Sequence, residues 1–224
     1  MLDFGFYNED CLPRMKEYPN NFFDLAIVDP PYGIGVGSMH YTNGVDRAGK
    51  GVAKRRDYRH QEWDFRPDEE YFKELLRISK KQIIWGGNYF SDMLPPSRSF
   101  IVWDKRCLDR LTNGFADCEY AWASKGCGVA RMFRYIWDGM LQNNMKDKED
   151  RIHPTQKPVA LYEWILTNYA KPGDKILDTH AGSGSSLIAC ENLHFKYVGF
   201  EIDKEYYDAA CKRIADYTAQ ISMF

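Results

Sequence analysis

The order strand, glycine turn, helix between residues 175 and 191 is the feature that most constrains the fold of this chain. Lys175–Asp178 reads as a short buried strand, Thr179–Ser186 follows it with two glycines, and residues 187–191 have helical spacing. In doubly wound folds such a turn joins a parallel strand to a helix, and its glycines let backbone N–H groups approach a bound nucleotide. The turn lacks both the G-x-G-x-x-G spacing and the lysine of a phosphate-binding P-loop. It therefore predicts a nucleotide-like ligand without identifying one.

The rest of the chain alternates in the same way. Apolar runs predict strands at residues 4–7, 22–28, 82–85, 99–103, 118–123, 175–178 and 197–201. Helical spacing predicts a helix opening at residues 67–68 and further helices at 159–169, 185–193 and 204–217. This alternation favours a single α/β domain over residues 1–224, with a Rossmann-like, doubly wound and mostly parallel sheet. Ligands bind such sheets outside the carboxyl ends of the strands. Polar residues follow several of these ends and predict one shared site: Asp10, Asp29, Asn88, Asp178 and Glu201.

The segment Asp29-Pro30-Pro31-Tyr32, which follows the strand at 22–28, has the chemistry of a site for an amine. The Asp29 carboxylate and the Pro30 carbonyl are both acceptors, and the prolines hold the turn rigid because their φ is fixed. Tyr32 offers a flat ring beside them. This combination suits a planar ring that carries an NH2 group. Glu201 ends the next predicted strand, about twenty residues after the start of the glycine turn. An acid at this position typically binds ribose hydroxyls.

Three motifs together resemble the N4/N6 DNA methylase family, whose members use S-adenosylmethionine. Asp29–Tyr32 looks like their catalytic motif. Asp178–Ser186 is similar to their cofactor loop, although Thr179-His180 replaces the usual aromatic residue. His153–Pro158 resembles the segment that packs over the methionine end of the cofactor in this family. The catalytic motif comes first, which is the order of the β group of DNA methyltransferases. The resemblance implies a class I methyltransferase fold with circularly permuted motifs.

The resemblance also implies roles for individual residues. Catalysis falls to Asp29, Pro30, Pro31 and Tyr32, which place the amine for in-line attack, mainly by positioning and preorganised dipoles. In the cofactor site, Glu201 takes the ribose hydroxyls, Asp10 contacts the adenine edge, and residues 178–184 surround the methionine portion. The full set of predicted cofactor residues is Asp10, Cys11, Asp29, His153, Thr155, Lys157, Asp178, His180, Ala181, Gly182, Ser183, Gly184, Glu201 and Ile202.

The target base is predicted from the first residue of the catalytic motif. By family resemblance, Asp at this position favours adenine N6, and cytosine N4 remains the alternative because both rings carry an NH2 beside a ring nitrogen. A duplex hides that amine, so the base must flip out at a cost of a few kcal/mol, of which stacking on Tyr32 returns about 1–3 kcal/mol. Three other functions are open: an RNA adenine methyltransferase, a non-catalytic nucleic-acid-binding module and a nicotinamide-dependent oxidoreductase. The intact catalytic motif argues against the second, and the glycine spacing argues against the third.

Two segments are candidates for contact with DNA. A glycine-rich loop at 33–62 carries six basic and two acidic residues between positions 45 and 60, whereas the whole chain has a formal net charge of −2. Such a loop suits a phosphate backbone. Residues 125–150 occupy the interval in which the β group carries its recognition region, and this interval is short. The predicted nucleic-acid-binding residues are Arg47, Lys50, Lys54, Arg55, Arg56, Arg59, Arg131 and Arg134.

Composition and cysteine usage set the remaining expectations. No apolar run approaches the ~20 residues that span a bilayer, and the N-terminus lacks a secretion signal, so we expect a cytoplasmic, bacterial or phage-encoded protein. The six cysteines are scattered without a C-x-x-C pair, which predicts reduced thiols and no metal site. DNA is the expected partner. A homodimer is one way to extend so short a recognition region.

Overall fold

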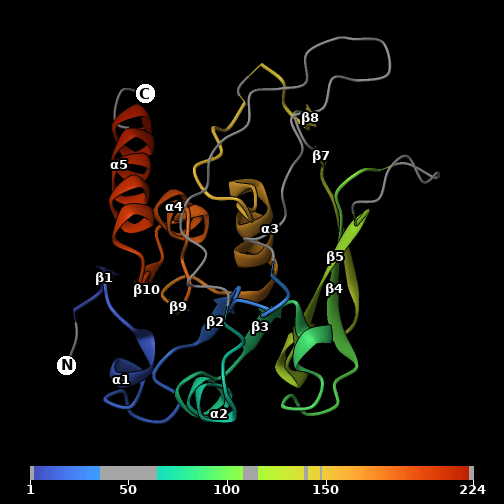
Figure 1. The fold of residues 1–224 in the computed structure, drawn as a ribbon, viewed down its shortest axis with the longest axis vertical. Coiled ribbons are helices and arrows are strands. Elements are labelled where there is room, and N and C mark those ends of the chain that lie inside the picture. Colours follow the sequence, from blue (N-terminus) through green and yellow to red (C-terminus); the bar gives the residue numbers. More distant parts are fainter. Residues whose placement is uncertain (1–2, 36–64, 108–115, 139–140, 147, 222–224) are drawn as a thin grey trace.

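The computed structural model describes residues 3–35, 65–107, 116–138, 141–146 and 148–221, and within them eight strands form one sheet (Figure 1). Their order is β1-β10-β9-β2-β3-β5-β4-β6. The bounds are Gly5–Tyr7 (β1), Leu25–Val28 (β2), Gln82–Trp85 (β3), Ser99–Asp104 (β4), Cys118–Ala123 (β5), Arg131–Arg134 (β6), Lys175–Asp178 (β9) and Lys196–Phe200 (β10). Neighbouring strands are parallel except that β5 runs antiparallel to both β3 and β4. The predicted mostly parallel sheet is confirmed.

Helices cover both faces of this sheet, as the doubly wound prediction requires. α1 (Cys11–Met15) and α2 (Glu69–Ile78) lie on one face, and α3 (Val159–Tyr169), α4 (Ser185–Asn192) and α5 (Lys204–Ile221) lie on the other (Figure 1). In β2, Leu25 and Ile27 pack toward α3 and α4, whereas Ala26 and Val28 pack toward α1 and α2. A strand buried on both faces reads as a continuous apolar run, which explains the sequence of β2.

The start of α2 shows local sequence and core packing in agreement. The Asp68 carboxylate caps the helix by accepting a hydrogen bond from the Tyr71 N–H at 3.0 Å. Glu69 and Glu70 place negative charge in the first turn, where the helix dipole favours it. The buried residues follow helical spacing: Tyr71, Phe72, Leu75 and Ile78. The helix predicted to open at residues 67–68 is therefore confirmed.

Several element bounds shift by a few residues from the sequence prediction, and some elements were not predicted at all. β2 begins at Leu25 rather than at residue 22, because Phe23 makes only an isolated bridge to Ser79. The short helix α1 was not predicted, since five residues are too few to show a periodic pattern. β6 was also missed, and it pairs in parallel with β4 inside the interval predicted for DNA recognition. A strand at the edge of a sheet needs no continuous apolar run, so the sequence of β6 carries no clear strand signal. A separate two-stranded sheet follows it, formed by β7 (Trp137–Asp138) and β8 (Leu141–Gln142).

Candidate active site

The carboxyl ends of β1, β2, β9 and β10 meet at one edge of the sheet and border a cavity of about 600 Å³. This volume is in the range of small-molecule and cofactor sites. The predicted residues that line it are Asp10, Cys11, Asp29, Pro31, His153, Thr155, Lys157, His180, Ala181, Gly182, Ser183, Glu201 and Ile202. The predicted residues that are not part of its wall are Pro30, Tyr32, Asp178 and Gly184. The structure thus brings the three sequence motifs to one cavity.

Glu201 fastens the glycine turn to the end of β10. Its Oε2 accepts a hydrogen bond from the Gly182 N–H at 2.9 Å, and its Oε1 accepts one from the Asp203 N–H at 2.8 Å. Gly182 has φ +53°, a conformation that costs glycine little. Burial raises the pKa of Glu201, and the two backbone donors oppose that rise. Both carboxylate oxygens keep acceptor capacity, which suits a pair of ligand hydroxyls.

Asp178 is a buried carboxylate beneath the same turn. One oxygen accepts a hydrogen bond from the His180 N–H at 3.0 Å, and the other accepts one from the Ser186 hydroxyl. Burial is the largest cause that raises the pKa of Asp178 to about 7, and the negative charges of Asp29 and Glu201 add to the rise. Asp178 therefore holds the turn from below rather than forming the cavity wall.

The variant Asp178→Asn is expected to stabilise the ligand-free protein above neutral pH. The folded-state pKa of about 7 lies above the ordinary value, so the wild type loses stability at this group as pH rises from about 4 to about 7. Asparagine removes the buried charge, and its amide can still accept from the His180 N–H and donate to the Ser186 hydroxyl. The gain in free energy of unfolding grows across this range to at most about 4 kcal/mol. Denaturant unfolding of both proteins, with the exposed Asp216→Asn as control, measures it; a pH-independent difference contradicts the prediction.

Two histidines of the predicted set form uncharged walls of the cavity. Burial lowers the pKa of His153 to about 3 and that of His180 to about 4, so both rings are neutral at physiological pH. The His153 Nδ1 accepts a hydrogen bond from the Thr155 N–H at 3.3 Å. The His180 Nδ1 lies 2.9 Å from the Thr179 hydroxyl, which lies 2.6 Å from the Tyr71 hydroxyl. These contacts fix the orientation of both rings.

The segment after β1 contributes Asp10 and Cys11. The Asp10 carboxylate caps α1 by accepting a hydrogen bond from the Leu12 N–H at 3.0 Å, a structural role that the sequence did not reveal. Burial raises the pKa of the Cys11 thiol, so this side chain is uncharged. Ile202 lines the cavity with 63% of its surface exposed, which places it at the solvent side.

The catalytic turn follows β2, and both oxygens of the Asp29 carboxylate are engaged. Oδ1 accepts a hydrogen bond from the Tyr32 hydroxyl at 2.7 Å, and Oδ2 is ion-paired with Lys157. The Lys157 Nζ also lies 3.3 Å from an oxygen of Glu119 on β5. Burial alone would lower the pKa of Lys157, but the carboxylates of Asp29 and Glu119 raise it, so the ammonium stays charged. The turn therefore presents acceptors backed by a fixed positive charge.

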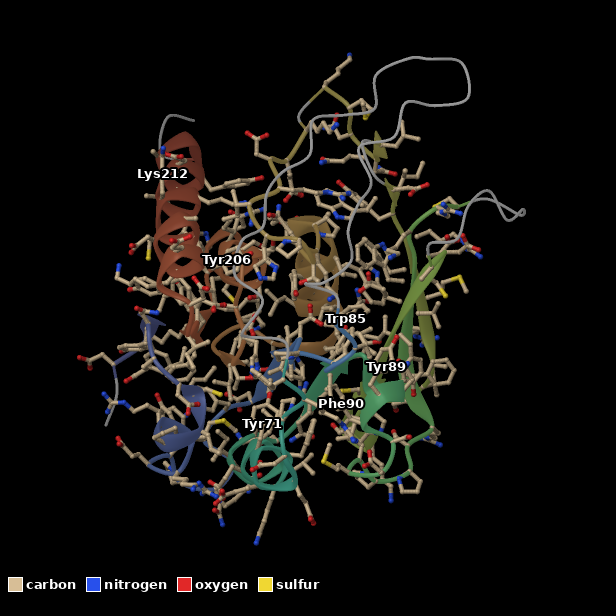
Figure 2. All side chains as sticks on the ribbon, viewed as in Figure 1. Tyr71, Trp85, Tyr89, Phe90, Tyr206 and Lys212 are labelled. Carbon is tan, nitrogen blue, oxygen red and sulfur yellow. The ribbon has the colours of Figure 1, made fainter. Side chains whose placement is uncertain are left out.

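The ring of Tyr32 is held between a glycine and a second tyrosine. Its centroid lies 4.8 Å from that of Tyr89, and the two rings are 20° from parallel. Gly86 has φ +67°, and a Cβ at this position would come within 2.1 Å of the Tyr32 ring. Any residue with a Cβ at position 86 would displace the Tyr32 ring. Tyr89 and Phe90, labelled in Figure 2, belong to the short helix η2 (Gly87–Phe90) that follows β3.

Several other candidates lie apart from the cavity. Asn88, predicted to border the shared site, is exposed and is not part of the cavity wall. Arg131 and Arg134 are exposed on β6. The predicted phosphate contacts of the basic loop lie outside the described residues: Arg47, Lys50, Lys54, Arg55, Arg56 and Arg59.

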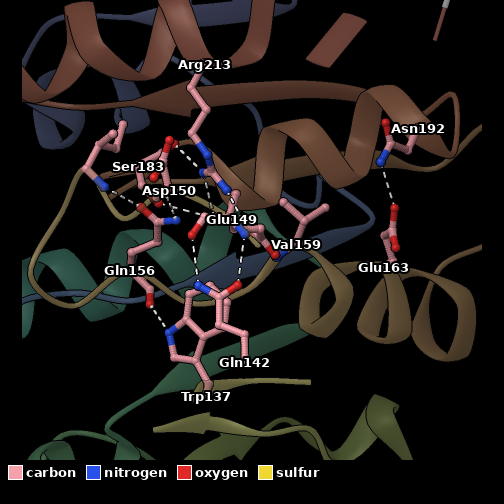
Figure 3. Close-up of polar contacts among 12 residues, drawn as sticks. Trp137, Gln142, Glu149, Asp150, Gln156, Val159, Glu163, Ser183, Asn192 and Arg213 are labelled. Carbon is pink, nitrogen blue, oxygen red and sulfur yellow. Dashed lines mark hydrogen bonds and ion pairs between the residues drawn. The ribbon is translucent and has the colours of Figure 1, made fainter. Parts of the chain in front are cut away.

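A buried network attaches the end of the segment 125–150 to the glycine turn (Figure 3). Arg213 of α5 pairs with the Glu149 carboxylate at 2.6 Å and donates to the Ser183 carbonyl at 2.8 Å. The Glu149 carboxylate also accepts a hydrogen bond from the Val159 N–H at 3.2 Å, and the Glu149 backbone pairs with the side-chain amide of Gln142. The segment predicted for DNA recognition is therefore anchored to the cavity wall.

The cavity wall also contains residues that sequence reasoning missed. Tyr71 of α2 and Tyr162 of α3 line it, although their helical spacing indicates only core positions. The one feature of the sequence that could have indicated them is chemical. A tyrosine on the buried face of a helix carries a hydroxyl that needs a hydrogen-bond partner. Arg66, Pro67 and Asp68 line the cavity from the start of α2. Their position depends on tertiary structure that no local pattern shows.

Comparison with known proteins agrees with this geometry. Residues 102–212 match the N6_N4_Mtase family model, described as DNA methylase. The chain is 26% identical over 249 residues to the type II methyltransferase M.HinfI of Haemophilus influenzae, which covers 92% of this chain and 67% of the relative. The solved M1.HpyAVI–SAM complex has a TM-score of 0.56 and 22% identity, covering 93% of this chain and 98% of that one. The PvuII DNA methyltransferase, described as cytosine-N4-specific, has a TM-score of 0.57 and 13% identity, covering 99% and 93%.

The fold is that of the class I methyltransferases, and the motifs stand in permuted order at one cavity. The match of residues 102–212 to the DNA methylase family model, together with the type II methyltransferase relatives, confirms the resemblance to the N4/N6 DNA methylase family drawn from the sequence. The described residues contain no group of three His, Cys, Asp or Glu side chains arranged to hold a metal ion. In the same part of the chain no helix is long and apolar enough to cross a membrane.

Proposed function

We propose that this protein transfers a methyl group from S-adenosylmethionine to the exocyclic N6 amine of an adenine flipped out of DNA. One arrangement carries the proposal. The Asp29 carboxylate, backed by Lys157 and beside the Tyr32 ring, borders the cavity that Glu201 and the glycine turn line. The acceptor pair would hold the target amine, and the neighbouring cavity would hold the methyl donor. Methyl transfer requires these two ligands side by side, with the amine in line with the methyl group.

The cavity wall fits S-adenosylmethionine part by part. The Glu201 carboxylate suits the ribose hydroxyls, and the proposal assigns the adenine edge to Asp10 on the cavity wall. The turn around Gly182 suits the methionine portion, whose ammonium would favour the ionised form of Asp178 beneath it. The bound cofactor supplies a methyl group on a positively charged sulfonium. The solved relative M1.HpyAVI is titled as a SAM complex, which supports the same donor here.

In this proposal Asp29 and Pro30 position the target amine. The carboxylate and the carbonyl accept hydrogen bonds from its two N–H groups, which favours a more tetrahedral nitrogen with its lone pair toward the cavity. Oδ1 of Asp29 can accept the amine together with the Tyr32 hydroxyl, because a carboxylate oxygen has two lone pairs. The methylated nitrogen then loses its proton to Asp29 or to water. In this proposal the base would stack on the Tyr32 ring in place of Tyr89, which lies against that ring in the absence of DNA.

Adenine is favoured over cytosine by the residue at the first position of the catalytic motif, Asp29. Cytosine N4 is the second candidate, since the chain has the fold of an enzyme described as cytosine-N4-specific. At 13% identity that likeness shows the fold alone. The chemistry at the amine is the same for both bases, so the choice between them rests on the product.

We infer that DNA is held by basic residues of the segment 45–60 and by Arg131 and Arg134. The two arginines are exposed on β6, and the network around Arg213 anchors the neighbouring segment to the cofactor side of the cavity. Basic side chains at these positions would contact phosphates and make binding sensitive to salt. M.HinfI is named a type II methyltransferase, which supports a role in restriction–modification. A single catalytic domain and a homodimer stay predictions.

Methyl transfer to DNA and to RNA, followed by mass spectrometry of the nucleosides, tests the proposed function. The expected product is N6-methyladenine in DNA. N4-methylcytosine alone would correct the base while retaining the mechanism, and methylated RNA without methylated DNA would correct the substrate. Absence of transfer to either nucleic acid, with cofactor binding shown by calorimetry, would contradict the function.

A further inference from the structure

We propose that Glu119 is a positioning residue for the Asp29 carboxylate and that it acts through the buried ammonium of Lys157. The inference rests on the proposed methyl transfer at Asp29 and adds to it a residue that none of the three motifs contains. The three side chains come from distant parts of the chain: the turn after β2, the strand β5 and the segment before α3.

Four charged side chains form a continuous row that alternates in sign. The Lys105 Nζ lies 3.0 Å from Oε1 of Glu119, and Oε2 of Glu119 lies 3.3 Å from the Lys157 Nζ. Lys157 in turn is ion-paired with Oδ2 of Asp29. The Lys157 side chain is 3% exposed, compared with 16% for Asp29 and 29% for Glu119. Lys157, which pairs with both acids, therefore has the most buried of these three side chains.

The direction of β5 brings Glu119 to the active site. Ala121 of β5 pairs with Trp85, the last residue of β3. Because the two strands are antiparallel, Glu119 lies beyond the end of β3, at the edge where the catalytic turn follows β2. Burial alone would raise the pKa of Glu119, but Lys157 and Lys105 lower it, so the carboxylate is charged.

Glu119 determines where the Lys157 ammonium stands. Lysine is a point charge on a flexible stem, and with one partner it can swing toward either oxygen of Asp29 or into the cavity. With Glu119 on one side and Oδ2 of Asp29 on the other, the ammonium leaves Oδ1 to the Tyr32 hydroxyl and the target amine.

Substitution of Glu119 or Lys157 leaves the other titratable groups around Asp29 unchanged. They come from its own turn, α2, α3 and β9: Tyr32, Tyr71, Tyr162 and Asp178. Burial raises the pKa of the three tyrosines, so they are neutral, and Asp178 is a further acid. Removing Lys157 leaves Asp29 among acids without its cation, whereas removing the charge of Glu119 leaves the cation and one acid fewer. The two changes therefore shift the pH dependence in opposite directions.

A double-mutant cycle combined with pH–rate profiles tests the inference. Glu119→Gln should lower kcat about tenfold and change the KM for S-adenosylmethionine less than about twofold, because it disturbs the acceptor rather than the cofactor site. The acidic limb of the pH–rate profile of Glu119→Gln should move to lower pH. Lys157→Met should move the acid limb to higher pH by about one unit or more. Since Glu119 acts through Lys157, adding Glu119→Gln to Lys157→Met should not lower kcat further.

Two further variants separate positioning from stability. Glu119→Asp keeps the charge on a shorter side chain, so it should lower kcat less than Glu119→Gln and leave the acid limb in place. Lys80→Met removes a lysine that pairs with Asp24 beside the opposite end of β2, and it should keep the wild-type kcat and profile.

The inference is overturned by either of two results. One is a loss of thermal stability in Glu119→Gln with no shift of the pH profile. The other is an equal loss of kcat from Glu119→Gln in the presence and absence of Lys157. If Glu119→Gln does not fold, an unshifted acid limb in Lys157→Met overturns the inference in its place. A wild-type protein that methylates no nucleic acid contradicts the proposed function, whereas an active wild type matched by Glu119→Gln contradicts only the role of Glu119.

Discussion

Asp29→Ala is expected to lower kcat for methyl transfer by a factor of about 10³ or more, because removal of one preorganised group at a reacting centre already costs about 10²–10³. The variant loses the acceptor aimed at the amine. Within the described part of the chain, it also leaves Glu119 as the one acid in ion-pair distance of the buried Lys157 ammonium. Cofactor affinity should fall by no more than about tenfold, since Glu201 and the glycine turn are untouched. Single-turnover transfer measures the first effect, and calorimetry with S-adenosylmethionine measures the second.

Asp24→Ala is the matched control for this variant. Asp24 lies just before β2 and pairs with Lys80 at 2.6 Å, so its removal also breaks an aspartate–lysine pair, but at the opposite end of the strand. It should cost stability and retain kcat. Tyr32→Phe removes the hydroxyl that donates to Asp29 and keeps the ring, and it should retain most of the activity. Full activity in Asp29→Ala would refute the mechanism.

The fold was predictable wherever burial decides an element. α3 begins and ends at the predicted residues 159–169, because its buried residues follow helical spacing. β9 begins and ends at the predicted residues 175–178, because it is a buried apolar run. β6 escaped prediction because it is an edge strand with exposed arginines. α1 escaped it because a helix of five residues depends on the Asp10 cap and on tertiary packing, and it shows no periodic signal.

The site was predictable at the ends of the parallel strands and not elsewhere. Asp29, Asp178 and Glu201 each end or follow an apolar run, and parallel strands place such ends at one edge of a sheet. Glu119 also reaches that edge, but from the beginning of an antiparallel strand. Strand direction is a tertiary property, so in the sequence Glu119 reads only as a polar residue in an alternating strand. Tyr162 likewise reads as core until the cavity beside α3 is seen.

Glu201→Ala is expected to weaken binding of S-adenosylmethionine and of its demethylated product by about 10²-fold, because a hydrogen bond to a charged group is worth about 1.5–3 kcal/mol. Two losses combine. In the proposed site the ribose hydroxyls would lose their ionised acceptor, and the Gly182 N–H loses the partner that holds the glycine turn at 2.9 Å. The fold should persist, since the carboxylate faces the cavity and the core around β10 is apolar. Calorimetric titration of both ligands measures the change.

Asp203→Ala provides the control for charge. Asp203 lines the same cavity, but its carboxylate accepts hydrogen bonds from the Glu205 and Tyr206 N–H groups at 2.8 and 3.1 Å, at the start of α5. Its removal takes away the same charge without a proposed ligand contact, so affinity should fall only a few-fold. Equal losses in the two variants would mean that the cavity attracts the cationic ligand by charge alone. Unchanged affinity in Glu201→Ala would place the ribose elsewhere, and tight NAD binding without binding of S-adenosylmethionine would overturn the cofactor assignment.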